Sequence, residues 1–120
     1  MSGFRNLIVW QRSKDLAIEI FRITQQGTFS NDFGLKNQIR KASVSISSNI
    51  AEGDERASNK EAVRFLYIAK GSLAELQTQM EIAHEIGYLN SEKYEFLDME
   101  CRRIGKMLGT LIKARTTRNP

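Results

Sequence analysis

The amino-acid sequence predicts an all-α fold, an antiparallel up-down-up-down four-helix bundle. In four long segments joined by short connections, apolar residues recur mostly at steps of three and four, which is the spacing of a helix with one buried face. The only proline, Pro120, is the last residue, so proline interrupts no helix. No segment alternates apolar and polar residues with a period of two, which argues against strands. The length suits one hydrophobic core, and a single domain, 1–120, is expected.

The first helix is expected at about residues 7–25. Its apolar row consists of Val9, Leu16, Ile20 and Ile23. Gly27 follows this row and is a suitable residue to stop a helix. Asn31 or Asp32 then offers a side-chain oxygen that can cap the next helix.

The second helix, expected at about 32–53, is built partly from poor helix formers. Serine and asparagine crowd residues 43–49, and each costs up to about 0.7 kcal/mol relative to alanine inside a helix. Helical spacing is nevertheless kept by Leu35, Ile39, Ala42, Ile46, Ile50 and Gly53. We infer that tertiary packing or a binding role holds this segment helical.

The third and fourth helices are expected at about 59–86 and 92–115, with the most regular patterns in the chain. Ser58 and Glu61 have the spacing of a capping box, in which each side chain bonds the other residue's backbone N–H. The third helix has an apolar row with a 3.5-residue repeat: Ala62, Leu66, Ala69, Leu73, Leu76, Met80 and Ala83. The fourth repeats this spacing with Tyr94, Leu97, Cys101, Ile104, Leu108 and Leu111.

The third helix also has a second row, which indicates self-association. This row is apolar at its ends and polar at its centre: Phe65, Ile68, Ser72, Glu75, Gln79, Ile82 and Ile86. A helix with two adjacent rows either lies deep in a bundle or faces a neighbouring subunit. Gly105 and Gly109 stand four residues apart on the fourth helix and would let another backbone approach closely. We therefore expect the chain to associate with copies of itself.

Composition indicates a cytoplasmic protein. Apolar residues make up 41% of the chain and charged residues 27%, an ordinary balance for a soluble domain. A single cysteine, Cys101, excludes an internal disulfide and suits a reducing compartment. The only apolar run near the N-terminus, residues 7–10, is too short for a signal peptide, and no apolar stretch is long enough to span a membrane.

The net charge of +4 is concentrated near the C-terminus. Residues 101–120 contain six basic residues and no acid, whereas residues 1–100 contain 12 basic and 14 acidic residues. Such a segment is typical of a surface that binds phosphates or an acidic partner. The candidate phosphate contacts are Arg102, Arg103, Lys106, Lys113 and Arg115, with Arg118 completing the charge. The alternative is a solvated helix end whose cations complement the helix dipole.

A second candidate surface is the polar face of the helix at 32–53. Its members share helical spacing, and we name them with their expected neighbours on the third helix: Arg40, Lys41, Ser45, Ser48, Asn49, Glu52, Arg56, Glu75 and Gln79. Serine, asparagine and arginine can all donate to phosphate oxygens. In the structural alternative, Ser48 and Asn49 pack against Glu75 or Gln79, and Arg40 or Arg56 pairs with Glu52 or Glu75. The same groups could also fix the register between subunits.

No residue pattern predicts catalysis, a metal or a cofactor. Glu81 and His84 have the Glu-x-x-His spacing of di-iron bundles, but such sites need two of these motifs and His84 is the only histidine. Cys101 lies in an apolar row, the position of a buried small residue rather than of a reactive thiol. Trp10 and Tyr67 fit core or interface positions better than a platform for stacked bases.

Three segments resemble a known family. Residues 38–42 (QIRKA), 45–53 (SISSNIAEG) and 71–79 (GSLAELQTQ) are similar to the 23S rRNA-intervening-sequence proteins, with further likeness at residues 7–16, 33–35, 87–89 and 106–108. The chain departs at Ser47, where that family usually has proline. The resemblance implies a homopentamer of four-helix bundles with no established catalytic activity. The family is also similar to the basic accessory proteins of diversity-generating retroelements, which associate with a reverse transcriptase and nucleic acid.

Two functional hypotheses follow. The first is a non-enzymatic oligomeric bundle that binds nucleic acid, RNA or DNA, or an RNA–protein assembly, through basic patches repeated in each subunit. The second is a scaffold or adaptor whose partner is another protein, docked on the polar face of the second helix without direct nucleic-acid contact. Neither hypothesis requires a cofactor or a membrane.

Overall fold

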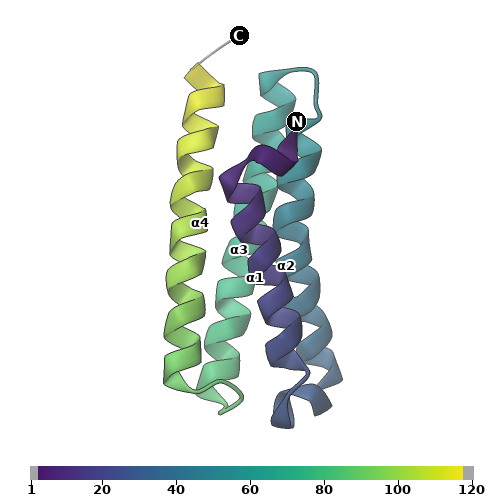
Figure 1. Ribbon diagram of the computed structural model, residues 1–120, viewed down its shortest axis with the longest axis vertical. Helices are drawn as coiled ribbons and strands as arrows, with labels where there is room; N and C mark the ends of the chain where they lie inside the picture. Colours follow the sequence, from purple (N-terminus) through teal and green to yellow (C-terminus); the bar gives the residue numbers. More distant parts are fainter. Residues whose placement is uncertain (1–2, 118–120) are drawn as a thin grey trace.

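Four helices packed side by side form the whole architecture of residues 3–117, the part of the chain that the computed structural model describes (Figure 1). The helices are α1 (Ile8–Thr24), α2 (Phe33–Asp54), α3 (Asn59–Glu85) and α4 (Ser91–Thr117). No strand occurs among these residues, which confirms the all-α prediction. The bundle is a rod of 48 × 23 × 20 Å.

The helix bounds lie within two residues of those expected from the sequence. Two short 3₁₀ helices were not foreseen, η1 (Phe4–Asn6) and η2 (Gly27–Asn31). Gly27 is not the residue that stops α1, contrary to prediction. The helix ends at Thr24 and Gln25 keeps an α conformation, while Gly27, with φ +58°, opens η2. Its left-handed conformation therefore serves the connection rather than the helix end.

Side chains cap α2 and α3. The Asp32 carboxylate accepts a hydrogen bond from the Leu35 backbone N–H at 3.0 Å and another from the Tyr88 hydroxyl at 2.9 Å. These two bonds hold the pKa of Asp32 below its usual value and link α2 to the α3–α4 connection.

The expected capping box at α3 is only half formed. Ser58 Oγ accepts from the Glu61 N–H at 3.2 Å, as predicted. The Glu61 carboxylate does not bond back to the Ser58 N–H; it lies 4.0 Å from the Arg56 guanidinium. Arg56, at the α2–α3 connection, therefore competes with the Ser58 N–H for the Glu61 carboxylate.

The predicted apolar rows form the core. Every member of the first α3 row is buried, and so are Leu97, Cys101, Ile104 and Leu108 of α4. Near the end of α4, Ile112 is buried in place of Leu111, which is half-buried. The central polar members of the second α3 row, Ser72 and Gln79, are also buried.

The helices are arranged so that α2 and α3 pack closely, while α1 and α4 touch over a smaller area. The closest approach is at Gly53, where an added Cβ would lie 3.0 Å from the Ala62 carbonyl oxygen. Figure 1 shows the start of α1, the α2–α3 connection and the end of α4 at one end of the rod. No helix within residues 3–117 has the length and apolar character needed to cross a bilayer.

Candidate nucleic-acid interface

The polar face predicted on α2 divides between two sides of the helix. Arg40 turns toward α1, where its Nε donates to Thr24 Oγ1 at 2.8 Å and its Nη2 donates to the Phe21 carbonyl at 3.2 Å. Its guanidinium also lies 4.5 Å from the centre of the Phe21 ring. Arg40 therefore does not extend a surface shared with Ser45 and Asn49, contrary to prediction, because the neighbouring helix offers it acceptors and an aromatic face.

Ser45 bonds α2 to α3, and Asn49 supports Ser45 from the same helix. The hydroxyls of Ser45 and Ser72 lie 2.9 Å apart, and Asn49 Nδ2 donates to the Ser45 carbonyl at 2.8 Å and its hydroxyl at 3.0 Å. This supports a structural role for part of the face, but the partner is Ser72 rather than the predicted Glu75 or Gln79. Ser48 is exposed. The poor helix formers of α2 thus include one, Ser45, that supplies a hydrogen bond to α3, and a second, Asn49, that bonds to Ser45.

Arg56 is satisfied within its own neighbourhood. Its Nη2 lies 2.7 Å from the Glu52 carboxylate, which confirms one of the predicted pairings, and its guanidinium covers the Phe65 ring at 4.5 Å. Arg56 therefore has a carboxylate partner, whereas Arg40 keeps its charge but is held against α1 by neutral groups. The remaining members lie along the outer α2–α3 groove, where Lys41 and Glu75 are exposed and Gln79 is buried.

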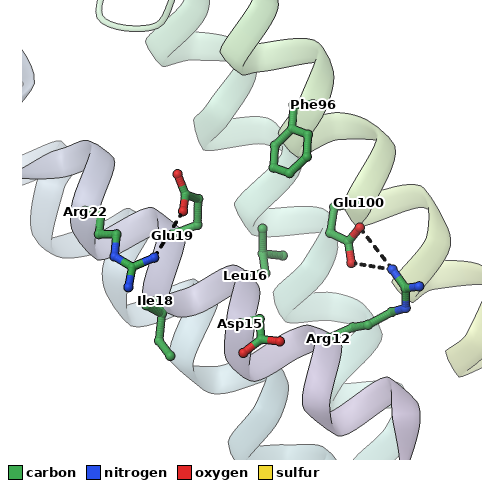
Figure 2. Close-up of a pocket in the computed structure, with 8 residues that line it drawn as sticks. All are labelled: Arg12, Asp15, Leu16, Ile18, Glu19, Arg22, Phe96 and Glu100. Carbon is green, nitrogen blue, oxygen red and sulfur yellow. Dashed lines mark hydrogen bonds and ion pairs between the residues drawn. The ribbon is translucent and has the colours of Figure 1, made fainter.

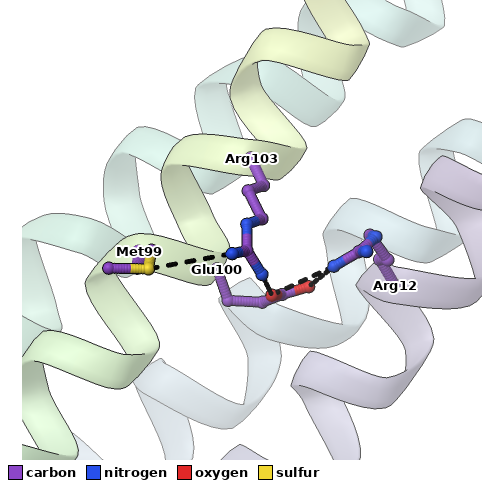
Figure 3. Close-up of polar contacts among 4 residues, drawn as sticks. All are labelled: Arg12, Met99, Glu100 and Arg103. Atoms are coloured by element: carbon purple, nitrogen blue, oxygen red, sulfur yellow. Dashed lines mark hydrogen bonds and ion pairs between the residues drawn. The ribbon is translucent and has the colours of Figure 1, made fainter.

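Three of the five predicted phosphate contacts on α4 are paired with acids. Arg102 lies 3.0 Å from Asp98, and Arg103 lies 3.6 Å from Glu100, which also pairs with Arg12 of α1 at 3.0 Å (Figure 3). Asp98 and Glu100 lie in the turn before residue 101. A count of charge that begins at residue 101 therefore overstates the basic character of α4.

Arg115 is a link between helices. It lies 3.1 Å from Asp54 at the end of α2, and the two side chains are only 20% and 15% exposed. Because Asp54 neutralises its charge between two helices, Arg115 is less suited to a phosphate contact than an exposed cation would be. Arg118 lies outside the described residues.

Lys106 and Lys113 remain the unpaired cations of the predicted set. Both are exposed, and neither forms an ion pair within residues 3–117. They lie seven residues apart, two turns along one face of α4. Lys113 lines a groove between α3 and α4 together with Tyr67, Lys70, Gly109, Ile112, Thr116 and Thr117, which we call the basic groove.

Sequence reasoning missed the α3 side of the basic groove. Lys70 lines it, and Arg64 lies two turns earlier on α3; both are exposed and unpaired in the described part of the chain. Tyr67, expected in a core or interface, is 58% exposed within the single chain. The sequence contains one signal for this exposure: residue 67 belongs to neither apolar row of the helix.

A second depression lies between α1 and α4. Figure 2 shows its lining side chains, with the Arg22–Glu19 and Arg12–Glu100 ion pairs on either side of Leu16. Phe96 and Ile18 also line it, and both are exposed. Its apolar surface and paired charges suit contact with a protein better than contact with phosphates.

The other candidates of the sequence have structural surroundings. His84 stacks on Tyr94 with ring centres 4.5 Å apart, and residues 3–117 contain no cluster of three metal-ligating side chains. Cys101 is fully buried, as expected for a core residue, and burial raises the pKa of its thiol to about 12. The thiol is therefore protonated at neutral pH and is not an activated nucleophile.

Comparison with known proteins supplies the family. A model of the 23S rRNA-intervening sequence protein family matches residues 5–110. The chain belongs to this family. The match spans all of α1, α2 and α3 and most of α4, so the family resemblance drawn from short segments is confirmed.

A solved structure of the same kind agrees with the fold of this 23S rRNA-intervening sequence protein. It is a Bacteroides thetaiotaomicron protein of unknown function, described as belonging to the S23 ribosomal protein family. The two chains share 25% sequence identity with a TM-score of 0.81, and the alignment covers 88% of this chain and 99% of the other. No curated protein matches this chain.

Proposed function

We propose that this chain is a non-enzymatic protein that assembles as a homopentamer of antiparallel up-down-up-down bundles and binds nucleic acid, RNA or DNA, through its α3–α4 surface. The observation that carries the proposal is the set of exposed cations without acidic partners on two adjacent helices: Arg64, Lys70, Lys106 and Lys113. Cations without acidic partners can exchange their counterions for phosphates, which drives nucleic-acid binding.

Repetition of this surface in an assembly would set the affinity. If each subunit contacts one or two phosphates, a pentamer neutralises about 5 to 10, and the logarithm of the binding constant should fall against the logarithm of salt with a slope of about −5 to −9. A single chain with the same contacts would give a slope of only about −1 to −2. The slope therefore reports the number of subunits engaged.

The test is filter binding of RNA and DNA between about 50 and about 200 mM salt. We expect Lys106→Glu with Lys113→Glu to abolish binding while helix content is retained. The matched control is Lys14→Glu with Lys93→Glu, which makes the same change of charge. Lys14 and Lys93 pair with Asp15 and Glu19 at the surface, and such ion pairs contribute little to stability. Absence of binding at low salt, or equal loss in both double variants, would contradict the proposal.

The second candidate function is a scaffold or adaptor without nucleic-acid contact. The observation that favours it is the exposed apolar surface at the α1–α4 depression, formed by Ile18 and Phe96, with Met99 exposed three residues further along α4. The polar face of α2 is less suitable for docking, since Ser45 is bonded to Ser72 of α3 and Asn49 is bonded to Ser45. A protein that binds no nucleic acid at low salt but still self-associates would favour this function.

A further inference from the structure

The most unusual side chain of the basic groove is Tyr67. Its ring is 58% exposed on the middle of a long helix, and it forms no aromatic pair within residues 3–117. Arg64 and Lys70 each lie three residues away on α3, so a cation stands one turn to either side of the ring. An apolar ring between two unpaired cations is the combination that single-stranded nucleic-acid sites use.

The opposite wall of the groove leaves room beside the ring. Gly109 has no side chain, and a Cβ built there would meet no atom within 4 Å. Ile112 is buried, while Lys113 is exposed at the groove. The groove thus offers an open space between an aromatic ring and a lysine from the facing helix.

The lysines that line this groove have no acidic partner within residues 3–117, which distinguishes it from the α1–α4 and α1–α2 depressions. None of its lining residues is a carboxylate, whereas Asp15, Glu19 and Glu100 line the α1–α4 depression. The depression between α1 and α2 also has two cations, but Lys14 and Arg22 lie close to Asp15 and Glu19. Phosphates would therefore meet less repulsion and less competition in the basic groove.

We infer that the basic groove binds single-stranded nucleic acid, with a base stacked on Tyr67 and the flanking phosphates on Lys70 and Lys113. A base in a duplex is stacked on its neighbours and has no free face for Tyr67, so a duplex can use the lysines alone. The inference rests on the proposed function, to which it adds the kind of strand and the contacting residues. A partner protein or a neighbouring subunit seated on Tyr67 is the competing explanation.

The experiment compares Tyr67→Ala and Tyr67→Phe on poly(U), poly(dT) and a blunt RNA duplex. Loss of a stacked base typically weakens binding by about 5- to 150-fold, so we expect Tyr67→Ala to lose about tenfold or more on a single strand and little on the duplex. Tyr67→Phe keeps the ring and should retain single-strand binding. Poly(U) and poly(dT) distinguish RNA from DNA.

Two results would overturn the inference while leaving the proposed function intact. One is that Lys113→Glu weakens binding to the single strand while Tyr67→Ala binds it as tightly as the wild-type protein. The other is loss of self-association in Tyr67→Ala, which would place Tyr67 between subunits. Failure of the proposed function looks different, because the wild-type protein would then bind none of the three probes. Unchanged helix content in Tyr67→Ala is expected because the ring is exposed.

Discussion

At the scale of single residues, identical side chains on α4 have different roles because of what lies beside them. Neither Arg102 nor Arg115 has an acidic residue next to it in the sequence. In the structure, Arg102 lies over its own helix with 77% of its side chain exposed, whereas Arg115 reaches Asp54 of α2 in a partly buried ion pair. Because the Arg115–Asp54 pair is partly buried, removing one of its partners costs more stability than removing one partner of an exposed pair.

Replacement of these two arginines should therefore affect stability differently. We expect Arg115→Gln to lower the free energy of unfolding by about 1–3 kcal/mol, because the partly buried Asp54 carboxylate loses its partner. The control, Arg102→Gln, should change it by about 0.5 kcal/mol or less, since the Arg102 side chain is exposed and pairs within its own helix. Urea denaturation at neutral pH measures both values. Equal effects would mean that the Arg115 pair is no more structural than the Arg102 pair.

The residue scale is also where prediction from sequence reached its limit. The apolar spacing located every helix and nearly every core residue, because it follows from the geometry of one helix. The partners of Ser45 and Arg40 depend instead on how separate helices are rotated against each other. Ser72 is 27 positions from Ser45, and Thr24 is 16 from Arg40. No local pattern contains that information, so the candidate site was only partly predicted.

At the scale of helices, small residues determine how closely α2 approaches α3. Within one chain, a Cβ at Gly105 would meet only the side chain of Leu73, at 3.3 Å, and one at Gly109 would meet nothing within 4 Å, so the expected approach of a neighbouring subunit's backbone at these glycines stays a prediction. The close backbone contact is at Gly53, the last member of the α2 row. The end of the row thus fixes the geometry of the α2–α3 connection.

Alanine at Gly53 should therefore be harmful despite its better helix propensity. The new methyl group would lie 3.0 Å from the Ala62 carbonyl oxygen and 3.1 Å from Phe65 Cβ, and overpacking of this kind costs about 1–3 kcal/mol. Gly71→Ala is the matched control inside α3, where no atom lies within 4 Å, and it should stabilise the protein by about 0.5–1 kcal/mol. Thermal unfolding followed by circular dichroism distinguishes the signs. A stabilised Gly53→Ala would contradict the close approach.

At the scale of the whole molecule, two of the exposed apolar surfaces lie on different helices. One set lies on α1 and α4 and consists of Ile18, Phe96 and Met99; the other lies along α3 and consists of Ile68, Ile82 and Ile86. A closed ring of identical subunits joins one surface of each copy to a different surface of the next. Two exposed apolar sets on one chain meet that requirement.

A charge placed in either set should prevent ring assembly. We expect the unmodified protein to have five times the 13.7 kDa mass of one chain, and Phe96→Glu or Ile82→Glu alone to have the mass of one. Mixing the two variants leaves each with one intact surface, so pairs should form and growth should stop there. Light scattering measures all four samples. A mixture that stays monomeric, or an unmodified protein of single-chain mass, would contradict the arrangement.

The two ends of the rod differ in charge, so a ring built from parallel rods would have two unlike sides. Arg64 and Lys113 lie toward the end where α3 begins and α4 finishes, while exposed Glu85, Glu92 and Glu95 lie toward the opposite end. Rotation about a single axis keeps every copy pointing the same way. If the rods stand along the symmetry axis, these cations lie at one rim and these carboxylates at the other, so an anionic polymer would be attracted more strongly by the first rim.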